Sequence, residues 1–170
     1  LMNPILSAGI LIGVLCGVWT FVMGFTGWYR DPAMTSLFFV VILFELGGLY
    51  WGLRRTAAQG RSYGPQVMAG TMMAAIAGVI IIGSSLLFTT LAFPDYFQEL
   101  EAIHRQQLAD AGTSPGDIET AVQAQAMMQT PLANAMAGFF GTLITGIIGS
   151  IIIAAFVKAP ATSPTAFARE

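Results

Sequence analysis

Glu45 is the residue whose type and position could do chemistry in an apolar environment. It is the only acidic or basic side chain inside any of the long hydrophobic runs of this sequence. A charge at such depth costs roughly 3 kcal/mol or more, so residues of this kind usually face other protein and mark proton or ion pathways. One interpretation of Glu45 is therefore a proton or cation relay.

The other interpretation of Glu45 is structural. Gly48 and Gly52 lie on its helical face, which indicates contact with another helix rather than with lipid. A relay normally requires a second ionisable group at depth, and the hydrophobic runs contain none, so we favour a protonated acid that serves packing. At 1.5 Å per residue Glu45 lies about 12 Å below the basic end of its run. The hydroxyls at that depth belong to Ser150 and Thr71, and we predict that Glu45 hydrogen-bonds one of them.

Other kinds of chemistry find little support in the sequence. The single cysteine, Cys16, and the single histidine, His104, cannot build a cysteine cage or a histidine cluster for a metal. Polar side chains within the apolar runs could hydrogen-bond between helices, but they form no nucleophile–base pair. They include Ser84, Ser85, Asn134, Thr142 and Thr145. The sequence therefore predicts a protein that is not an enzyme and has no cofactor.

The composition defines the environment of these residues. Hydrophobic residues make up 55% of the 170 residues and charged residues 9%, with a mean hydropathy of +0.72. Soluble domains carry about 25% charged residues, so this chain could not cover a water-facing surface. The sequence predicts an integral membrane protein. Its net charge of -2 favours neither a nucleic acid nor an acidic partner.

Four apolar runs are long enough to cross a bilayer, which takes about 20 residues. They cover residues 4–27, 33–53, 66–93 and 131–157. The first run lacks a basic segment before it and a cleavage site after it, so we expect a retained helix rather than a signal peptide. The four runs predict a single transmembrane domain (1–158). The tail (159–170), rich in Ala, Pro, Thr and Ser, should be disordered in isolation.

Residues 94–130 form the only polar insertion between the runs. Apolar side chains recur at helical spacing on both sides of Gly112, which is a plausible helix stop. Ser114 and Pro115 are typical of a helix start, and Thr130 with Pro131 repeats this signal before the fourth run. The chain is therefore an all-α membrane protein with four transmembrane helices and an external helical hairpin between helices three and four. We expect the hairpin to lie over the outer face, its apolar stripes packed on each other or on lipid.

Small residues recur every four positions in three of the four runs. This spacing gives a helix one smooth face, on which another backbone can approach closely and hydroxyls can bond across. The first run carries Gly9, Gly13 and Gly17, the third Gly70, Ala74 and Gly78, and the fourth Gly138, Thr142, Gly146, Ser150 and Ala154. These faces predict helix–helix contacts.

Basic residues predict the orientation. Five of the seven fall on one side of the predicted membrane, namely Arg54, Arg55, Arg61, Lys158 and Arg169. Arg30 and Arg105 fall on the other. The positive-inside bias therefore places both termini in the cytoplasm. Arg54, Arg55 and Arg61 could also bind anionic lipid headgroups, although setting the topology alone would explain them equally well.

Short motifs spread over nearly the whole chain resemble a known family. They are "NPIL" at residues 3–6, "WGLRR" at 51–55, Tyr63-Gly64, and "FPDYF" at 93–97 leading into the capped acidic hairpin. Together they resemble family 4199 of the bacterial domains of unknown function. The resemblance implies a small four-helix protein of the bacterial inner membrane and brings no activity, substrate or cofactor. The loop "TAAQGRS" at residues 56–62 departs from the family pattern, because members often carry more charge there.

Three functions follow as hypotheses. The first is a non-catalytic accessory subunit that packs against a larger membrane complex of the respiratory or photosynthetic type, since a partner would hold the tail. The second is a small oligomeric transporter or channel with Glu45 on its path. The third is a lipid-binding protein that uses the cytoplasmic arginines and the hairpin. Membrane lipids and other membrane subunits are the expected partners, and nucleic acid is not.

Overall fold

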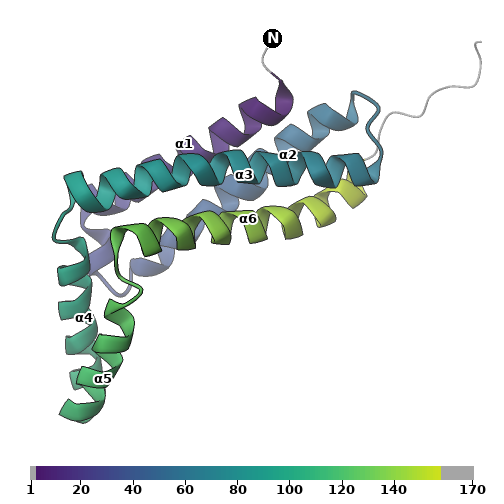
Figure 1. Ribbon diagram of the computed structural model, residues 1–170. Coiled ribbons are helices and arrows are strands. Elements are labelled where there is room, and N and C mark those ends of the chain that lie inside the picture. The colour runs from purple at the N-terminus through teal and green to yellow at the C-terminus, as the bar shows by residue number, and fades with distance from the viewer. Residues whose placement is uncertain (1–2, 158–170) are drawn as a thin grey trace, which may run out of the picture.

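Four long helices run side by side, and two shorter helices form a hairpin at one end of them (Figure 1). The structure, a computed structural model, describes residues 3–157. Its elements are α1 (Pro4–Thr26), η1 (Trp28–Arg30), η2 (Thr35–Phe39), α2 (Val40–Ala57), α3 (Tyr63–Leu87), η3 (Phe88–Ala92), α4 (Tyr96–Asp110), α5 (Pro115–Ala126) and α6 (Pro131–Phe156). This arrangement confirms the predicted fold class. The predicted tail, Lys158 and Arg169 lie outside the described residues.

The four long helices are apolar and long enough to cross a membrane, as expected of a multi-pass membrane protein. The candidate spans are Pro4–Thr26, Thr35–Ala57, Tyr63–Ala92 and Pro131–Phe156. The second begins two residues later than predicted, because the Asp31 side chain accepts the Ala33 N–H and holds residues 31–34 in a turn. The third begins three residues earlier, at Tyr63.

Local sequence explains most helix ends. The Asn3 side chain caps α1 by accepting the Ile5 N–H, and the Thr130 hydroxyl caps α6 by accepting the Ala133 N–H. Ser114 caps α5 and donates to the carboxylate of Asp117, as its spacing predicts. Gly112 ends α4 with a φ of 77°, a left-handed conformation that favours glycine.

Helix α3 has the largest interfaces of the bundle, one with α6 and one with α1. The small-residue faces form both of them. On α1, a Cβ added at Gly13 would lie 2.8 Å from the Cβ of Ile80. On α6, Gly146 lies against Ala74, and Ser150 lies against the glycine at position 70. Several of the predicted small residues therefore lie at helix–helix contacts within the described chain.

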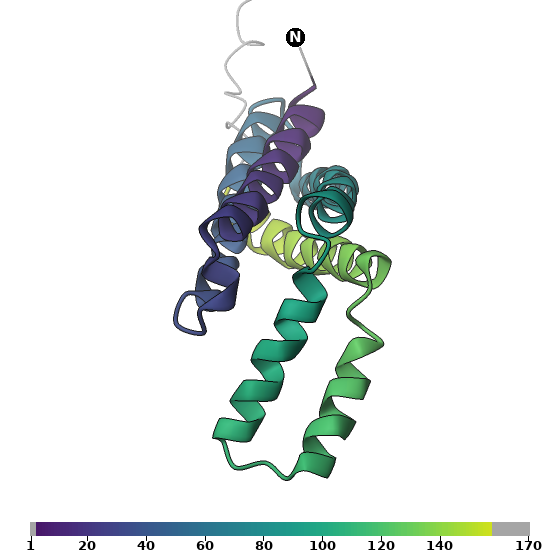
Figure 2. The ribbon, with the colours of Figure 1, turned by 90° about the vertical axis from the view of Figure 1, so that its left-hand side faces the viewer.

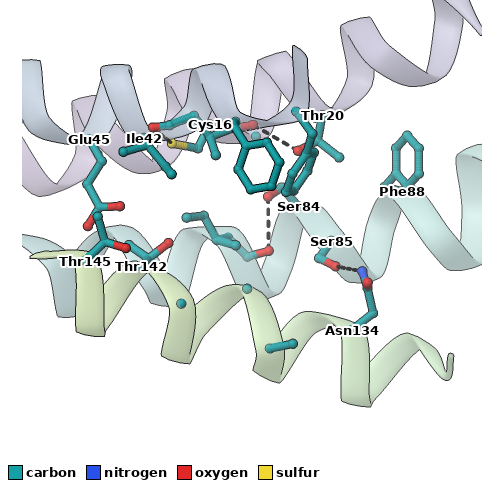
Figure 3. A pocket seen from close by; sticks show the side chains of 18 of the residues that line it. Cys16, Thr20, Ile42, Glu45, Ser84, Ser85, Phe88, Asn134, Thr142 and Thr145 are labelled. Atoms are coloured by element: carbon teal, nitrogen blue, oxygen red, sulfur yellow. Dashed lines mark hydrogen bonds between the residues drawn. The ribbon is translucent and has the colours of Figure 1, made fainter. Parts of the chain in front are cut away.

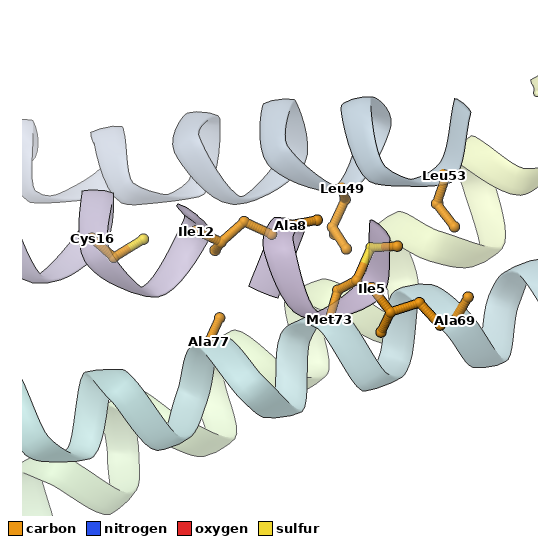
Figure 4. Close-up of a cluster of buried hydrophobic side chains, with 9 residues drawn as sticks. All are labelled: Ile5, Ala8, Ile12, Cys16, Leu49, Leu53, Ala69, Met73 and Ala77. Carbon is orange, nitrogen blue, oxygen red and sulfur yellow. The ribbon is translucent and has the colours of Figure 1, made fainter. Parts of the chain in front are cut away.

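The buried apolar core lies where α1, α2 and α3 meet (Figure 4). Its fully buried side chains include Ile12, Leu49, Leu53 and Met73. Gly52 of α2 faces this core, and a Cβ there would lie 2.7 Å from both the Cβ of Ala8 and the sulfur of Met73. Close approach of α1 and α2 therefore depends on this glycine.

The hairpin α4–α5 runs across the direction of the spans and extends beyond their outline (Figures 1 and 2). The hairpin therefore starts at one end of the bundle and projects to one side of it, and does not cover the ends of the four helices. Val122 is buried, and Ile118 and Leu108 are half-buried. These apolar side chains match the predicted stripes.

The hairpin leaves the bundle through the π-helical turn η3. The Phe93 N–H donates to the carbonyl oxygen of Phe88 at 2.8 Å, one residue further back than in an α-helix. This turn brings the rings of Phe88 and Phe93 to 4.6 Å between centroids, and Tyr96 packs edge-on against Phe88. An aromatic cluster therefore fixes the base of the hairpin.

Candidate functional site

A cavity of about 360 Å³ lies between the four long helices, in the half of the bundle next to the hairpin (Figure 3). We call this half the hairpin half (residues 16–26, 35–45, 78–92 and 131–145). The opposite half, next to Arg54 and Arg55, is the arginine half (residues 5–12, 46–57, 63–74 and 146–157). Side chains of α1, α2, α3 and α6, together with η2 and the start of α4, line the cavity.

Glu45 lies at the deep end of this cavity, where the hairpin half ends. Only 4% of the residue is exposed, and its Oε1 atom has no hydrogen-bond partner within the described residues. The carboxylate points from α2 toward Thr142 and Thr145 of α6 (Figure 3). Oε1 lies 3.0 Å from the position that a Cβ on Gly146 would take. Glu45 thus faces α6, as a helix contact requires.

The predicted hydrogen bond from Glu45 to Ser150 or Thr71 is wrong. The Ser150 hydroxyl donates to the carbonyl oxygen of Gly146 at 2.6 Å, and the Thr71 hydroxyl donates to that of Val67 at 3.0 Å. Both bonds stay within one helix, where the carbonyl four residues back is always within reach. Gly146, one turn before Ser150, is the residue that faces Glu45. The hydroxyls beside the carboxylate belong instead to Thr142 and Thr145.

The rest of the cavity wall combines aromatic rings with hydroxyl and amide groups. Asn134 of α6 donates from Nδ2 to the Ser85 hydroxyl of α3 at 3.0 Å and so links the two helices. The rings of Phe38, Phe88 and Tyr96 contribute to the wall. They also line an adjoining cavity of about 310 Å³.

The adjoining cavity leads to the base of the hairpin. It includes Tyr29 of η1 and Leu100 of α4, and it shares Thr20 and Asn134 with the first cavity. The two cavities together reach from the hairpin base to Glu45.

The arginine half closes this passage. Ile12, Leu49, Leu53, Met73 and Ser150 are all 0% exposed. They fill the space between the helices beyond Glu45. The cavity therefore ends at the carboxylate in this conformation.

An ion pair outside the spans joins the hairpin to the first loop. Arg30 donates to both carboxylate oxygens of Glu99, at 2.8 Å and 2.9 Å, and the Tyr29 hydroxyl donates to the same carboxylate. Hydrogen bonds from Arg30 and then from Tyr29 lower the pKa of Glu99. Burial raises the pKa of Tyr29, and the bond to Glu99 raises it further. From the sequence alone Arg30 counted only toward the charge balance, because two residues so far apart in sequence give no pattern.

The remaining predicted residues lie apart from the cavity. Arg54 and Arg55 are exposed at the end of α2, with their guanidinium carbons 5.8 Å and 4.0 Å from the ring centroids of Tyr50 and Trp51. The backbone carbonyl of Arg61 accepts a hydrogen bond from a side chain of α3. Among residues 3–157, no three His, Cys, Asp or Glu side chains are grouped so that they could hold a metal ion.

A family model described as "Protein of unknown function (DUF4199)" matches residues 7–159 of the chain. No curated protein and no solved structure matches it.

Proposed function

The chain belongs to the DUF4199 family, and we propose that it is a non-catalytic accessory subunit that packs against a larger bacterial membrane complex. The observation that carries this proposal is the α4–α5 hairpin, which extends beyond the outline of the spans (Figure 2). A protein that needed only its own bundle would gain nothing from an arm that reaches past it. A neighbouring subunit beside the bundle would lie within reach of this arm.

The base of the arm is fixed, which supports a defined direction of reach. Arg30 and Tyr29 hold Glu99 at the first turn of α4. The ring of Tyr96 packs 5.1 Å from Tyr29 and 5.1 Å from Phe88, measured between centroids. Bonds and rings together hold the arm on the spans rather than leaving it on a loose linker.

An exposed apolar group lies where the arm returns to α6. Met127, Met128 and Leu132 are 80%, 67% and 64% exposed. Methionine adapts to irregular partner surfaces, and grouped apolar side chains at a surface mark contact with protein or membrane. This group supports a contact on the side of the bundle that carries the hairpin.

Purification in mild detergent, followed by mass spectrometry of the membrane proteins that come with the chain, tests the proposal. We expect a defined set of subunits with the natural chain and loss of that set with Met127→Ser/Met128→Ser. Ala124→Ser/Ala126→Ser is the matched control, because both alanines are exposed on α5. A chain that purifies alone, or partners that survive the methionine change, would contradict the accessory role.

We also propose the bacterial inner membrane, with both termini and the α2–α3 loop in the cytoplasm and the hairpin outside. The distribution of basic residues supports this orientation. Gln59 and Gln106 are exposed on the loop and on α4, while the natural Cys16 is buried and should label poorly. An impermeant thiol reagent should label Gln106→Cys in cells with a permeable outer barrier, and Gln59→Cys only after lysis. Labelling of Gln59→Cys before lysis would invert the orientation.

The second candidate, a small transporter or channel with Glu45 on its path, is favoured by the cavity that ends at this residue. Passage would require the arginine half to open, because its core beyond Glu45 is closed. Cation and proton flux into proteoliposomes, compared between the natural chain and Glu45→Gln, tests this candidate. If the flux disappears with Glu45→Gln while the fold survives, the transporter or channel function becomes the better-supported candidate.

A further inference from the structure

We propose that the cavity ending at Glu45 binds an amphiphilic organic cation, a single ammonium group on an apolar body, whose ammonium pairs with the Glu45 carboxylate. This inference goes beyond the accessory role and does not depend on it. It rests on the carboxylate, the hydroxyls beside it, the apolar wall and the access to the cavity.

The carboxylate lacks a partner of its own. Its Oε1 atom is buried without a hydrogen bond, and within the described chain no Lys, Arg or His lines the cavity. The other titratable groups in the wall are Cys16 and Tyr96, neither of which supplies a positive charge. A buried acid requires either a proton or a cation beside it. An ammonium group provides a charge and N–H donors for the unpaired oxygen.

Two hydroxyls extend this acceptor set. Thr142 and Thr145 line the deep end of the cavity, and the Glu45 carboxylate points toward them (Figure 3). Within residues 3–157 neither hydroxyl makes a hydrogen bond, unlike those of Ser150 and Thr71. An ammonium at this position could donate to the carboxylate and to both threonines, so each of its three N–H groups has an acceptor.

The remainder of the wall suits an apolar body. Ile42 and Ile81 contribute aliphatic surface, and Phe38, Phe88 and Tyr96 contribute rings that also attract cations. The volume of about 360 Å³ falls within the usual range of small-molecule sites, about 300–1,000 Å³. An inorganic cation would leave most of this apolar surface uncovered, which is why an organic one fits better.

The cavity can be reached from the hairpin half. Phe38 and Phe39 of η2 are 48% and 66% exposed, and Ala137 and Gly141 of α6 are exposed opposite them. All four line the cavity, so its edge is open between η2 and α6. A ligand dissolved in that half of the membrane can enter without unfolding the bundle, and the closed core beyond Glu45 retains it.

Three phenyl-butyl compounds that differ only in their end group test the proposal. We would measure binding of 4-phenylbutylamine, 4-phenylbutanol and 4-phenylbutyrate to the full chain in non-ionic detergent at neutral pH by calorimetry. Hydrogen bonds to a charged group are stronger than those to a neutral one, so the amine should bind at least about tenfold more tightly than the alcohol. The carboxylate compound should not bind.

Variants assign the preference to Glu45. Glu45→Gln should reduce the amine preference to less than about threefold, whereas Glu101→Gln on the exposed hairpin should keep it. Gly141→Leu fills the edge of the cavity and should weaken amine binding at least about tenfold. Gly83→Leu is its matched control, because a Cβ at either glycine meets no atom within 4 Å and Gly83 lies outside the cavity wall.

Several outcomes would overturn the proposal. They are no amine binding, equal binding of amine and alcohol, or a preference that survives Glu45→Gln. If Glu45→Gln fails to fold, the comparison of Gly141→Leu with Gly83→Leu tests the site instead. The proposal is also rejected if Gly141→Leu leaves amine binding unchanged.

Discussion

The two halves of the four-helix bundle use the same helices but differ in how the small residues of α6 meet their neighbours. In the arginine half, Gly146 and Gly149 lie directly against side chains of adjacent helices. In the hairpin half, a Cβ at Gly141 would meet nothing within 4 Å, and one at Gly138 would meet only Ile81, at 3.1 Å. The small residues of α6 therefore contact adjacent helices closely in one half and border a cavity in the other.

The face of α6 shows this difference along a single helix. Its small residues recur every four positions from Gly138 to Ala154, but only those from Gly146 onward are buried. Spacing alone defines a face. Whether that face closes depends on the side chains opposite and on how the helices diverge, since α1 and α6 cross rather than run parallel (Figure 2).

The largest expected effect comes from filling a glycine in the arginine half. Gly146→Ile should overlap Ala74 and the Glu45 carboxylate and destabilise the bundle by about 3 kcal/mol. Gly141→Ile, on the same helix but beside the cavity, should change stability by less than about 0.5 kcal/mol. Thermal and denaturant unfolding in detergent measure both. Equal stability of the two variants would remove the distinction between the halves.

A second pair compares truncations one turn apart on α2. Leu49→Ala should cost about 3 kcal/mol, because Leu49 is 0% exposed in a closed core. Glu45→Ala should cost about 1 kcal/mol, because it enlarges a cavity that already exists and strands no partner. Glu45→Gln should cost less still. If Glu45→Ala lowers the free energy of unfolding as much as Leu49→Ala does, the Glu45 carboxylate contributes to packing of the bundle.

A third comparison measures the one side-chain hydrogen bond that links α3 and α6 across the hairpin half. In a double-mutant cycle, Asn134→Ala and Ser85→Ala should show a coupling of about 0.6 kcal/mol, typical of such bonds within membranes. Unfolding free energies of the two single variants and the double variant give this value. No coupling would mean that the amide and the hydroxyl contribute independently to stability.

The smallest expected effect concerns the base of the hairpin. Arg30 lowers the pKa of Glu99 below its ordinary value of 4.5, so the pair stabilises the arm above that pH and the contribution is lost as the pH falls through the lowered pKa. Protection factors, which divide out the intrinsic pH dependence of amide exchange, should therefore fall on acidification in the first turns of α4 and stay unchanged in α3. Glu99→Gln should show the lower protection already above pH 4.5. Identical exchange in both chains would mean that the aromatic cluster alone holds the arm.

Local chemistry explains what the sequence predicted correctly. The spans follow from run length and hydropathy, and the caps at Ser114 and Thr130 follow from side chains that bond backbone within three residues. The helix-packing glycines were also identified, because their spacing is a property of one helix.

Features that depend on distant segments were not predicted. Counting depth along straight, parallel spans placed Ser150 beside Glu45, whereas the crossing helices bring Gly146 there, one turn away. The cavity arises where four helices separate, and no single run records that separation. Thr142 and Thr145 were identified as hydrogen-bonding residues, but their position beside the carboxylate required the fold.

The π-helical turn η3 determines the direction in which the α4–α5 hairpin extends from the bundle. Each residue of an α-helix turns the chain by about 100°, so the one extra residue held between Phe88 and Phe93 decides the direction in which the hairpin leaves the bundle. Deletion of that residue would rotate the hairpin about the axis of α3, so that it points in a different direction along the membrane surface, and would leave the four spans unchanged. Family members that differ by one residue at this turn would therefore present the same arm to a different neighbour.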